Sequence, residues 1–148
     1  MTDALPGPVL TGINLFCRDL RATVAFYRRL GLDIDDTNPW SGHHIEVPMA
    51  NGAQLELESI ELTKGYDSGY VNPTSGGSRN VLVFHLPTRD AVDLAYAELT
   101  ADGHRGHLAP MDAFWGARYA VVDDPDGNSV GIMSPVDPDM RSDGPKLS

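Results

Sequence analysis

Residues 13–31 read INLFCRDLRATVAFYRRLG, and this stretch changes from a strand pattern to a helix pattern near its centre. Apolar residues occupy every second position from Ile13 to Cys17, which predicts a strand over residues 10–17. Apolar residues then recur at helical spacing, Asp19 can cap the first turn, and Gly31 ends the run. The stretch therefore predicts a strand followed directly by a helix.

The same order of patterns returns in the second half of the chain. Residues 81–86 have a strand pattern, Thr88 can cap a helix, and the helical stripe that follows ends at Gly103. A shift of 69 positions superimposes the two strand–helix units, and a shift of 75 positions superimposes residues 52–59 on residues 127–134. An insertion in the second copy explains both offsets, so we interpret the chain as a duplicated supersecondary unit.

Each half also contains a predicted hairpin. Strand patterns over residues 43–49 and 54–60 flank Asn51-Gly52, a pair typical of tight hairpin turns. Strand patterns over residues 118–122 and 129–133 flank the turn sequence Asp-Pro-Asp-Gly. The first half is therefore predicted to be a β-α-β-β block, and a further strand near Asp33 is an alternative.

Three segments lack a pattern that could fill a core. Residues 63–80 contain four glycines, a proline and no periodicity, which predicts a connector. Residues 1–8 and 136–148 are rich in Pro, Asp or Ser, so we expect both ends to be flexible.

Charge and composition exclude several classes of partner. The 148 residues include 21 Asp+Glu against 11 Lys+Arg, a net charge of -10, and nucleic acid binding needs the opposite sign. The only lysines are Lys64 and Lys146, and no apolar run approaches the ~18 residues of a membrane span, so we expect no membrane partner and a cytoplasmic protein. Cys17 is the single cysteine, which excludes an internal disulfide and Cys-rich zinc sites, and we expect it to be buried.

One stretch from each half of the chain resembles a known protein family. The stretch 13–31 resembles the opening strand and helix, and FWGARYAVVDDPDGNSVGIMSP (residues 114–135) the closing hairpin, of a module of the vicinal oxygen chelate superfamily. That superfamily includes glyoxalase I, extradiol dioxygenases and bleomycin-resistance proteins. The resemblance covers residues 9–135 and implies an α+β fold of two βαβββ modules, 9–62 and 81–135, whose curled sheets form a cup with the helices outside.

The resemblance also implies where a metal would be held. Enzymes of the superfamily usually carry ligands on the first and last strands of each module, and these positions fall on Gly12, Glu56, Val81 and Gly131. Three of the four have no donor atom, so we expect the usual metal site to be absent. Metal-free members, such as the resistance proteins that sequester antibiotics, become the nearer comparison.

Strand alternation predicts which side chains face the cup. If Gly12 faces it, Ile13, Leu15 and Cys17 face the helix, and the buried side is apolar. The predicted ligand-binding residues from the strands combine acids, histidines and apolar groups: Asn14, Phe16, His44, Glu46, Glu56, Glu58, His85 and Met133. Val81, Val83 and Gly131 face the same way.

Each of these residues also has a structural interpretation. The glutamates could alternate on a solvated sheet face, and His85 could be a structural histidine. Trp40, Phe114 and Trp115 are either core aromatics or stack on a ligand at the mouth of the cup. Arg118 is most simply an ion-pair partner, with a ligand anion as the alternative. We expect His104 and His107 to lie in an exposed loop.

No phosphate-binding loop or G-x-S-x-G nucleophile motif occurs in the chain. We therefore predict a metal-free protein without a cofactor that binds a small aromatic or polycyclic molecule, such as a cationic antibiotic. The alternative is a lyase, isomerase or oxygenase that uses a relocated Zn, Fe or Mn ion on His44, Glu46, Glu56 and His85, or Glu56 as a base.

Assembly is a separate expectation. Open sheet edges need cover, and the resemblance to resistance proteins points to a two-fold dimer. We predict a homodimer in which the Trp40 loop or the connector at residues 63–80 lies near the partner's cup.

Overall fold

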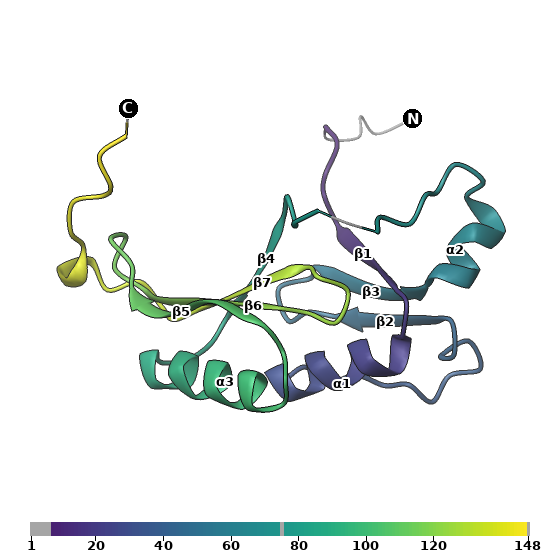
Figure 1. The fold of residues 1–148 in the computed structure, drawn as a ribbon, viewed down its shortest axis with the longest axis horizontal. Helices are drawn as coiled ribbons and strands as arrows, with labels where there is room; N and C mark the ends of the chain where they lie inside the picture. Colours follow the sequence, from purple (N-terminus) through teal and green to yellow (C-terminus); the bar gives the residue numbers. More distant parts are fainter. Residues whose placement is uncertain (1–6, 75, 148) are drawn as a thin grey trace, which may run out of the picture. The chain divides into compact units, whose positions relative to one another are not determined.

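The computed structural model describes residues 7–74 and 76–147, which form two compact units (Figure 1). The first unit contains β1 (Gly12–Cys17), β2 (His44–Pro48), β3 (Gln54–Ser59) and α2 (Ile60–Tyr66). The second unit contains α1 (Leu20–Leu30) from Arg21 onward, together with the elements of the second half. These are β4 (Val81–His85), α3 (Arg89–Ala101), β5 (Gly106–Asp112), β6 (Arg118–Asp123), β7 (Ser129–Met133) and the 3₁₀ turn η1 (Pro138–Met140).

The first unit is built on a three-stranded sheet in the order β1-β3-β2, with β1 parallel and β2 antiparallel to β3. Leu15, Leu57 and Ile45 lie in one row across the sheet and are buried, because each strand turns its apolar positions to the same side. The predicted hairpin turn between β2 and β3 is confirmed. Gly52 has a φ of 87°, and the side chain of Asn51 accepts a hydrogen bond from the backbone of Ala53.

Helix α2 follows β3 without a break and was not predicted. The backbone N–H of Leu62 donates to Ser59 Oγ at 3.1 Å, so Ser59 caps the helix. The segment predicted as a connector therefore begins with the last turn of a short helix. The sequence IELTKGY is too short to show helical periodicity, and its Gly65 argued against a helix.

The second unit is built on a four-stranded sheet in the order β4-β7-β6-β5. Helix α3 packs on one side of it, mainly against β6 and β5 (Figure 1). The fully buried core includes Val92 and Leu99 of α3 with Val122 and Ile132 of the sheet. The predicted cap is confirmed, because Thr88 Oγ1 accepts from the backbone N–H of Ala91 at 3.0 Å.

Helix α1 is tied to the turn between β6 and β7. The hydroxyl of Tyr27 donates to Asp124 Oδ2 at 2.8 Å, and Thr23 donates to Asp126 Oδ2 at 3.2 Å. Asp124 is buried and also accepts hydrogen bonds from Asp126 and Asn128. The Asp-Pro-Asp-Gly motif is thus both the predicted turn and the anchor of a helix from the other half of the sequence.

The α+β class and the two-sheet architecture are confirmed, with three strands in the first sheet and four in the second. No strand forms near Asp33 in the described part of the chain. The prediction of an exposed loop around His104 and His107 is wrong in one respect. His107 is exposed, but it lies on the strand β5, where its Nδ1 is 2.7 Å from Asp123 Oδ1. The sequence lacks a strand signal there because the strand contains Pro110 and its pairing is irregular.

The segment after β7 contacts the turn between β5 and β6. The backbone N–H groups of Asp137 and Ser142 donate to the carbonyls of Gly116 and Phe114. Gly116 has a φ of 99°, and a Cβ atom there would lie 2.4 Å from the Asp137 carbonyl oxygen. Nothing in the sequence pattern indicated these contacts, and the expected flexibility of residues 136–148 stays a prediction. In the described residues, no helix is both long and apolar enough to cross a membrane.

Candidate functional site

One face of the first sheet gathers most of the polar candidates. The register pairs Asn14 with Glu56 and Glu56 with Glu46, and it pairs Phe16 with Glu58 and Glu58 with His44. Residues that are directly opposite on neighbouring strands point to the same side of a sheet. We call this side the carboxylate face, with the members Asn14, Phe16, His44, Glu46, Glu56 and Glu58.

His44 lies at the start of the edge strand β2, and its ring faces three glutamates. Its Nε2 atom is 3.6 Å from Glu56 Oε1 and 3.9 Å from Glu46 Oε1, and its Nδ1 atom is 3.5 Å from Glu58 Oε2. The side chains differ in exposure, from 63% for Glu46 and 26% for Glu56 to 4% for Glu58. We call these four residues the His44 cluster.

Glu58 is the fixed member of the cluster. Its Oε1 atom accepts a hydrogen bond from Thr63 Oγ1 at 2.8 Å and another from the hydroxyl of Tyr66. Both donors lie on α2, so the unpredicted helix holds the carboxylate in place. The hydrogen bond to Glu58 is the main cause that raises the pKa of Tyr66 above 10.0, with a smaller effect of burial.

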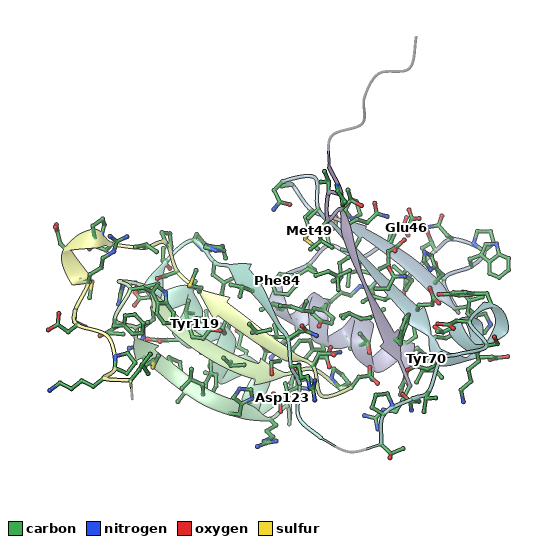
Figure 2. The ribbon with its side chains drawn as sticks, turned by 90° about the horizontal axis from the view of Figure 1, so that it is seen from above. Glu46, Met49, Tyr70, Phe84, Tyr119 and Asp123 are labelled. Atoms are coloured by element: carbon green, nitrogen blue, oxygen red, sulfur yellow. The ribbon has the colours of Figure 1, made fainter. Side chains whose placement is uncertain are left out.

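An aromatic pair lies at one end of the carboxylate face. The rings of Phe16 and Tyr70 meet edge to face with centroids 5.0 Å apart. Glu46 and Tyr70 are labelled in Figure 2, which shows the side chains of the strands. Phe16 is half-buried, so this pair is not fully enclosed in the core.

The donor atoms of the His44 cluster suit a positively charged occupant. One donor atom each from His44, Glu46 and Glu56 lies within 4.8 Å of the others. An imidazole nitrogen with carboxylate oxygens matches the preferences of zinc, manganese or iron, and carboxylates alone also bind amines and guanidinium groups. Glu56, which is partly buried, is also placed to accept a proton from a bound molecule.

The structure brings together three of the four residues suggested for a relocated metal. The fourth, His85, lies on β4 of the second unit, in one row with Met133 and Tyr119. Trp115 Nε1 donates to Met133 Sδ at 3.4 Å, and its ring lies 5.3 Å from that of Tyr119. Burial in this group raises the pKa of Tyr119 above 10.0.

Of the remaining candidates, Arg118 and Phe114 belong to the second unit, whereas the carbonyl of Trp40 accepts a hydrogen bond from the backbone N–H of His44 at 2.8 Å. Arg118 Nε donates to Asp93 at 2.8 Å and its NH1 to Asp112 at 3.2 Å, as its structural interpretation expected. Trp40 is 65% exposed in the turn before β2, and Phe114 is 43% exposed beside Trp115. Cys17 is buried, as expected.

Three residues that shape the site were missed by the sequence analysis, namely Thr63, Tyr66 and Tyr70. All of them lie in the segment interpreted as a connector. The available signal was the pair of tyrosines in a glycine-rich stretch, since aromatic residues in a loop often pack or bind rather than link.

The family model described as Glyoxalase/Bleomycin resistance protein/Dioxygenase superfamily matches residues 10–132. No protein among those with curated functions matches the chain. Many solved structures do, and they share its fold. A glyoxalase/bleomycin resistance protein/dioxygenase from Nocardioides is 22% identical with a TM-score of 0.69, and the match covers 98% of this chain and 93% of that one.

Two further structures are similar over most of their length. A glyoxalase-related enzyme from Fulvimarina pelagi is 25% identical with a TM-score of 0.70, covering 88% of this chain and 89% of that one. A lactoylglutathione lyase from Agrobacterium tumefaciens is 22% identical with a TM-score of 0.60, covering 87% and 94%.

Proposed function

Since the chain belongs to the glyoxalase/bleomycin resistance protein/dioxygenase superfamily, we propose that it binds a small aromatic or polycyclic molecule on the carboxylate face. The observation that carries this proposal is the His44 cluster, in which the carboxylates of Glu46, Glu56 and Glu58 surround one imidazole. Ligand sites typically combine apolar contacts with a few placed polar groups. Here the edge of Phe16 would supply the apolar contact.

The burial of Glu58 argues against the alternative that these glutamates only form a solvent-exposed sheet surface. A carboxylate that loses water is costly unless other donors replace it. Glu58 is only 3% exposed, and α2 supplies two hydroxyl groups to it. Such an arrangement holds the Glu58 carboxylate in one position, where it can in turn position His44 for a ligand.

The residues at the family's usual metal positions do not support its usual metal chemistry. Gly12, Val81 and Gly131 offer no donor, and Glu56 alone would not hold a divalent ion. Binding without turnover would make the chain a sequestering protein of the resistance type. We further propose that it assembles as a homodimer, because its open sheet edges need cover, and that it is cytoplasmic.

An enzyme is the second candidate, and the proximity of His44, Glu46 and Glu56 favours it. It would be a lyase, isomerase or oxygenase with a displaced metal, or an acid–base catalyst that uses Glu56. The two candidates differ in whether the bound molecule is changed, so chromatography of the ligand after incubation with the protein separates them.

A ligand screen tests the proposal. Aromatic and polycyclic antibiotics, cationic ones included, are screened by thermal shift, and each hit is measured by calorimetry. Glu56→Gln should weaken binding of a hit by about 1–3 kcal/mol, the range for a hydrogen bond to a charged group. Glu61→Gln, on the exposed side of α2, is the matched control and should not change affinity. The absence of any hit, or equal affinity of Glu56→Gln, would contradict the proposal.

A further inference from the structure

The cross-strand pairing places two like charges in an unfavourable position. Glu46 and Glu56 are directly opposite each other on the antiparallel strands β2 and β3. Like charges in such a pair destabilise a sheet, because their carboxylates share one side at close range. His44 Nε2 faces both of them, at 3.9 and 3.6 Å. The three groups therefore converge on one point that a cation would neutralise.

The spacing of the three donor atoms fits one small ion. Ligand atoms at about 2.0–2.2 Å from a zinc ion are separated by roughly 3.0–3.6 Å from one another. The two distances from His44 Nε2 are 3.6 and 3.9 Å and the three donor atoms all lie within 4.8 Å of one another, so the exposed Glu46 side chain would move inward when an ion binds. Three protein ligands leave at least one open position for water or a bound molecule.

A buried carboxylate stands behind the histidine. Glu58 Oε2 is 3.5 Å from His44 Nδ1, while Glu58 Oε1 is held by Thr63 and Tyr66. A histidine ligand commonly donates its second ring N–H to a carboxylate, which directs the lone pair of the other nitrogen to the metal. Glu58 faces Nδ1 of His44, so closing this 3.5 Å separation to a hydrogen bond on metal binding would leave Nε2 as the nitrogen that accepts the ion.

We propose that His44, Glu46 and Glu56 form a binding site for a divalent transition metal such as Zn²⁺, with Glu58 as the positioning residue. Two of the three ligands lie on β2, which carries none of the four positions where relatives usually hold a metal. The imidazole favours Zn²⁺ over Mg²⁺ or Ca²⁺, which prefer oxygen ligands alone. The proposal deepens the proposed function, because the ion would lie on the same carboxylate face.

Metal titration of the chelator-treated 148-residue chain tests the site. Zn²⁺ should bind at one ion per chain by calorimetry, and Co²⁺ should give the visible absorption of a bound ion with nitrogen ligation. His44→Ala and Glu56→Gln should each weaken Zn²⁺ binding by about 100-fold or more, and Glu58→Gln by about 10- to 100-fold. Because Glu58→Gln keeps the shape of the side chain, it also serves if His44→Ala folds poorly.

His107→Ala is the matched control, since His107 lies on β5 of the second unit, where its Nδ1 is 2.7 Å from Asp123 Oδ1. It should leave Zn²⁺ affinity unchanged. Equal affinities for Zn²⁺, Mg²⁺ and Ca²⁺, no binding of Zn²⁺, or full binding by His44→Ala would each overturn the metal site. The outcomes separate the two proposals, because Zn²⁺ binding is measured without an organic ligand, and an antibiotic hit that persists in chelator supports the proposed function without the metal.

Discussion

The two sheets have the same strand pairing but different side chains at the paired positions. In the first sheet, His44 is opposite Glu58 and Glu46 is opposite Glu56. Seventy-five positions later the second sheet pairs Tyr119 with Met133 and Val121 with Gly131. Every donor of the His44 cluster is thus replaced by a phenol, a thioether, a methyl-bearing side chain or a hydrogen. The strand pairing is thus the same in both sheets, but the three carboxylates occur only in the first, and the second has the imidazole of His85 in the row of Tyr119 and Met133.

The opposite faces of the two sheets did not diverge in this way. Leu57 and Ile132 occupy equivalent positions 75 residues apart, and each is 0% exposed. This difference between the faces is physical in origin. A core-facing position must fill space, whereas the other face is free to acquire charges or an aromatic group.

The largest expected effect tests whether the cores of the two units are equivalent. Leu57→Ala and Ile132→Ala should each lower the free energy of unfolding by about 3–4 kcal/mol, because each leaves a cavity among buried side chains. Urea denaturation followed by circular dichroism measures both values. A cost below about 1 kcal/mol for either variant would break the equivalence of the two cores.

A transplanted carboxylate tests the divergent faces. A Cβ atom at Gly131 would lie 2.7 Å from the hydroxyl of Tyr119, and Gly131 is buried. Gly131→Glu, which copies Glu56 into the second sheet, should therefore cost about 3 kcal/mol through crowding and an unpaired buried charge.

The reciprocal change is the control for that transplant. Glu56→Gly should cost no more than about 1 kcal/mol, the penalty of glycine in a strand, since it also removes a repulsive pair. Urea denaturation measures both, and equal costs for the two substitutions would show that the faces tolerate charge alike.

The sequence was sufficient to predict much of this comparison. Alternation along β1, β2 and β3 assigned His44, Glu46, Glu56 and Glu58 to one side, because a strand has a period of two regardless of its neighbours. The turn residues Gly52 and Gly127 were found for a similar local reason, and both have a positive φ.

Contacts that depend on chain reversal were not predictable from the pattern. Glu58 is held by Thr63 and Tyr66 only because a seven-residue helix folds back on β3, and such a helix is too short for a periodic signal. The bond between Tyr27 and Asp124 joins residues 97 positions apart, which no local rule identifies.

The two hairpin turns provide a third contrast. The first turn is closed by Asn51 and Gly52 within the chain segment itself, whereas the second turn also anchors α1 through Tyr27 and Asp124. Tyr27→Phe should therefore cost about 1–2 kcal/mol, because the buried Asp124 carboxylate loses a donor. Asn51→Ala removes a local turn contact alone and should cost less than that, as urea denaturation of both variants can show.

The smallest expected effect separates two tyrosines by the cause of their pKa shifts. The pKa of Tyr66 is raised mainly by its hydrogen bond to Glu58, and that of Tyr119 by burial, so both phenols should ionise above pH 10.0 in an ultraviolet titration. A raised folded-state pKa stabilises the fold below the ordinary pKa of the phenol, and this contribution is lost as the pH rises through the folded value. Glu58→Gln replaces the carboxylate that accepts the hydrogen bond of Tyr66 and should move that phenol back toward its ordinary pKa while Tyr119 still ionises late. Tyr66→Phe and Tyr119→Phe identify which step of the titration belongs to which ring. If Glu58→Gln shifted neither step, the hydrogen bond to Glu58 would not be the main cause of the raised pKa of Tyr66.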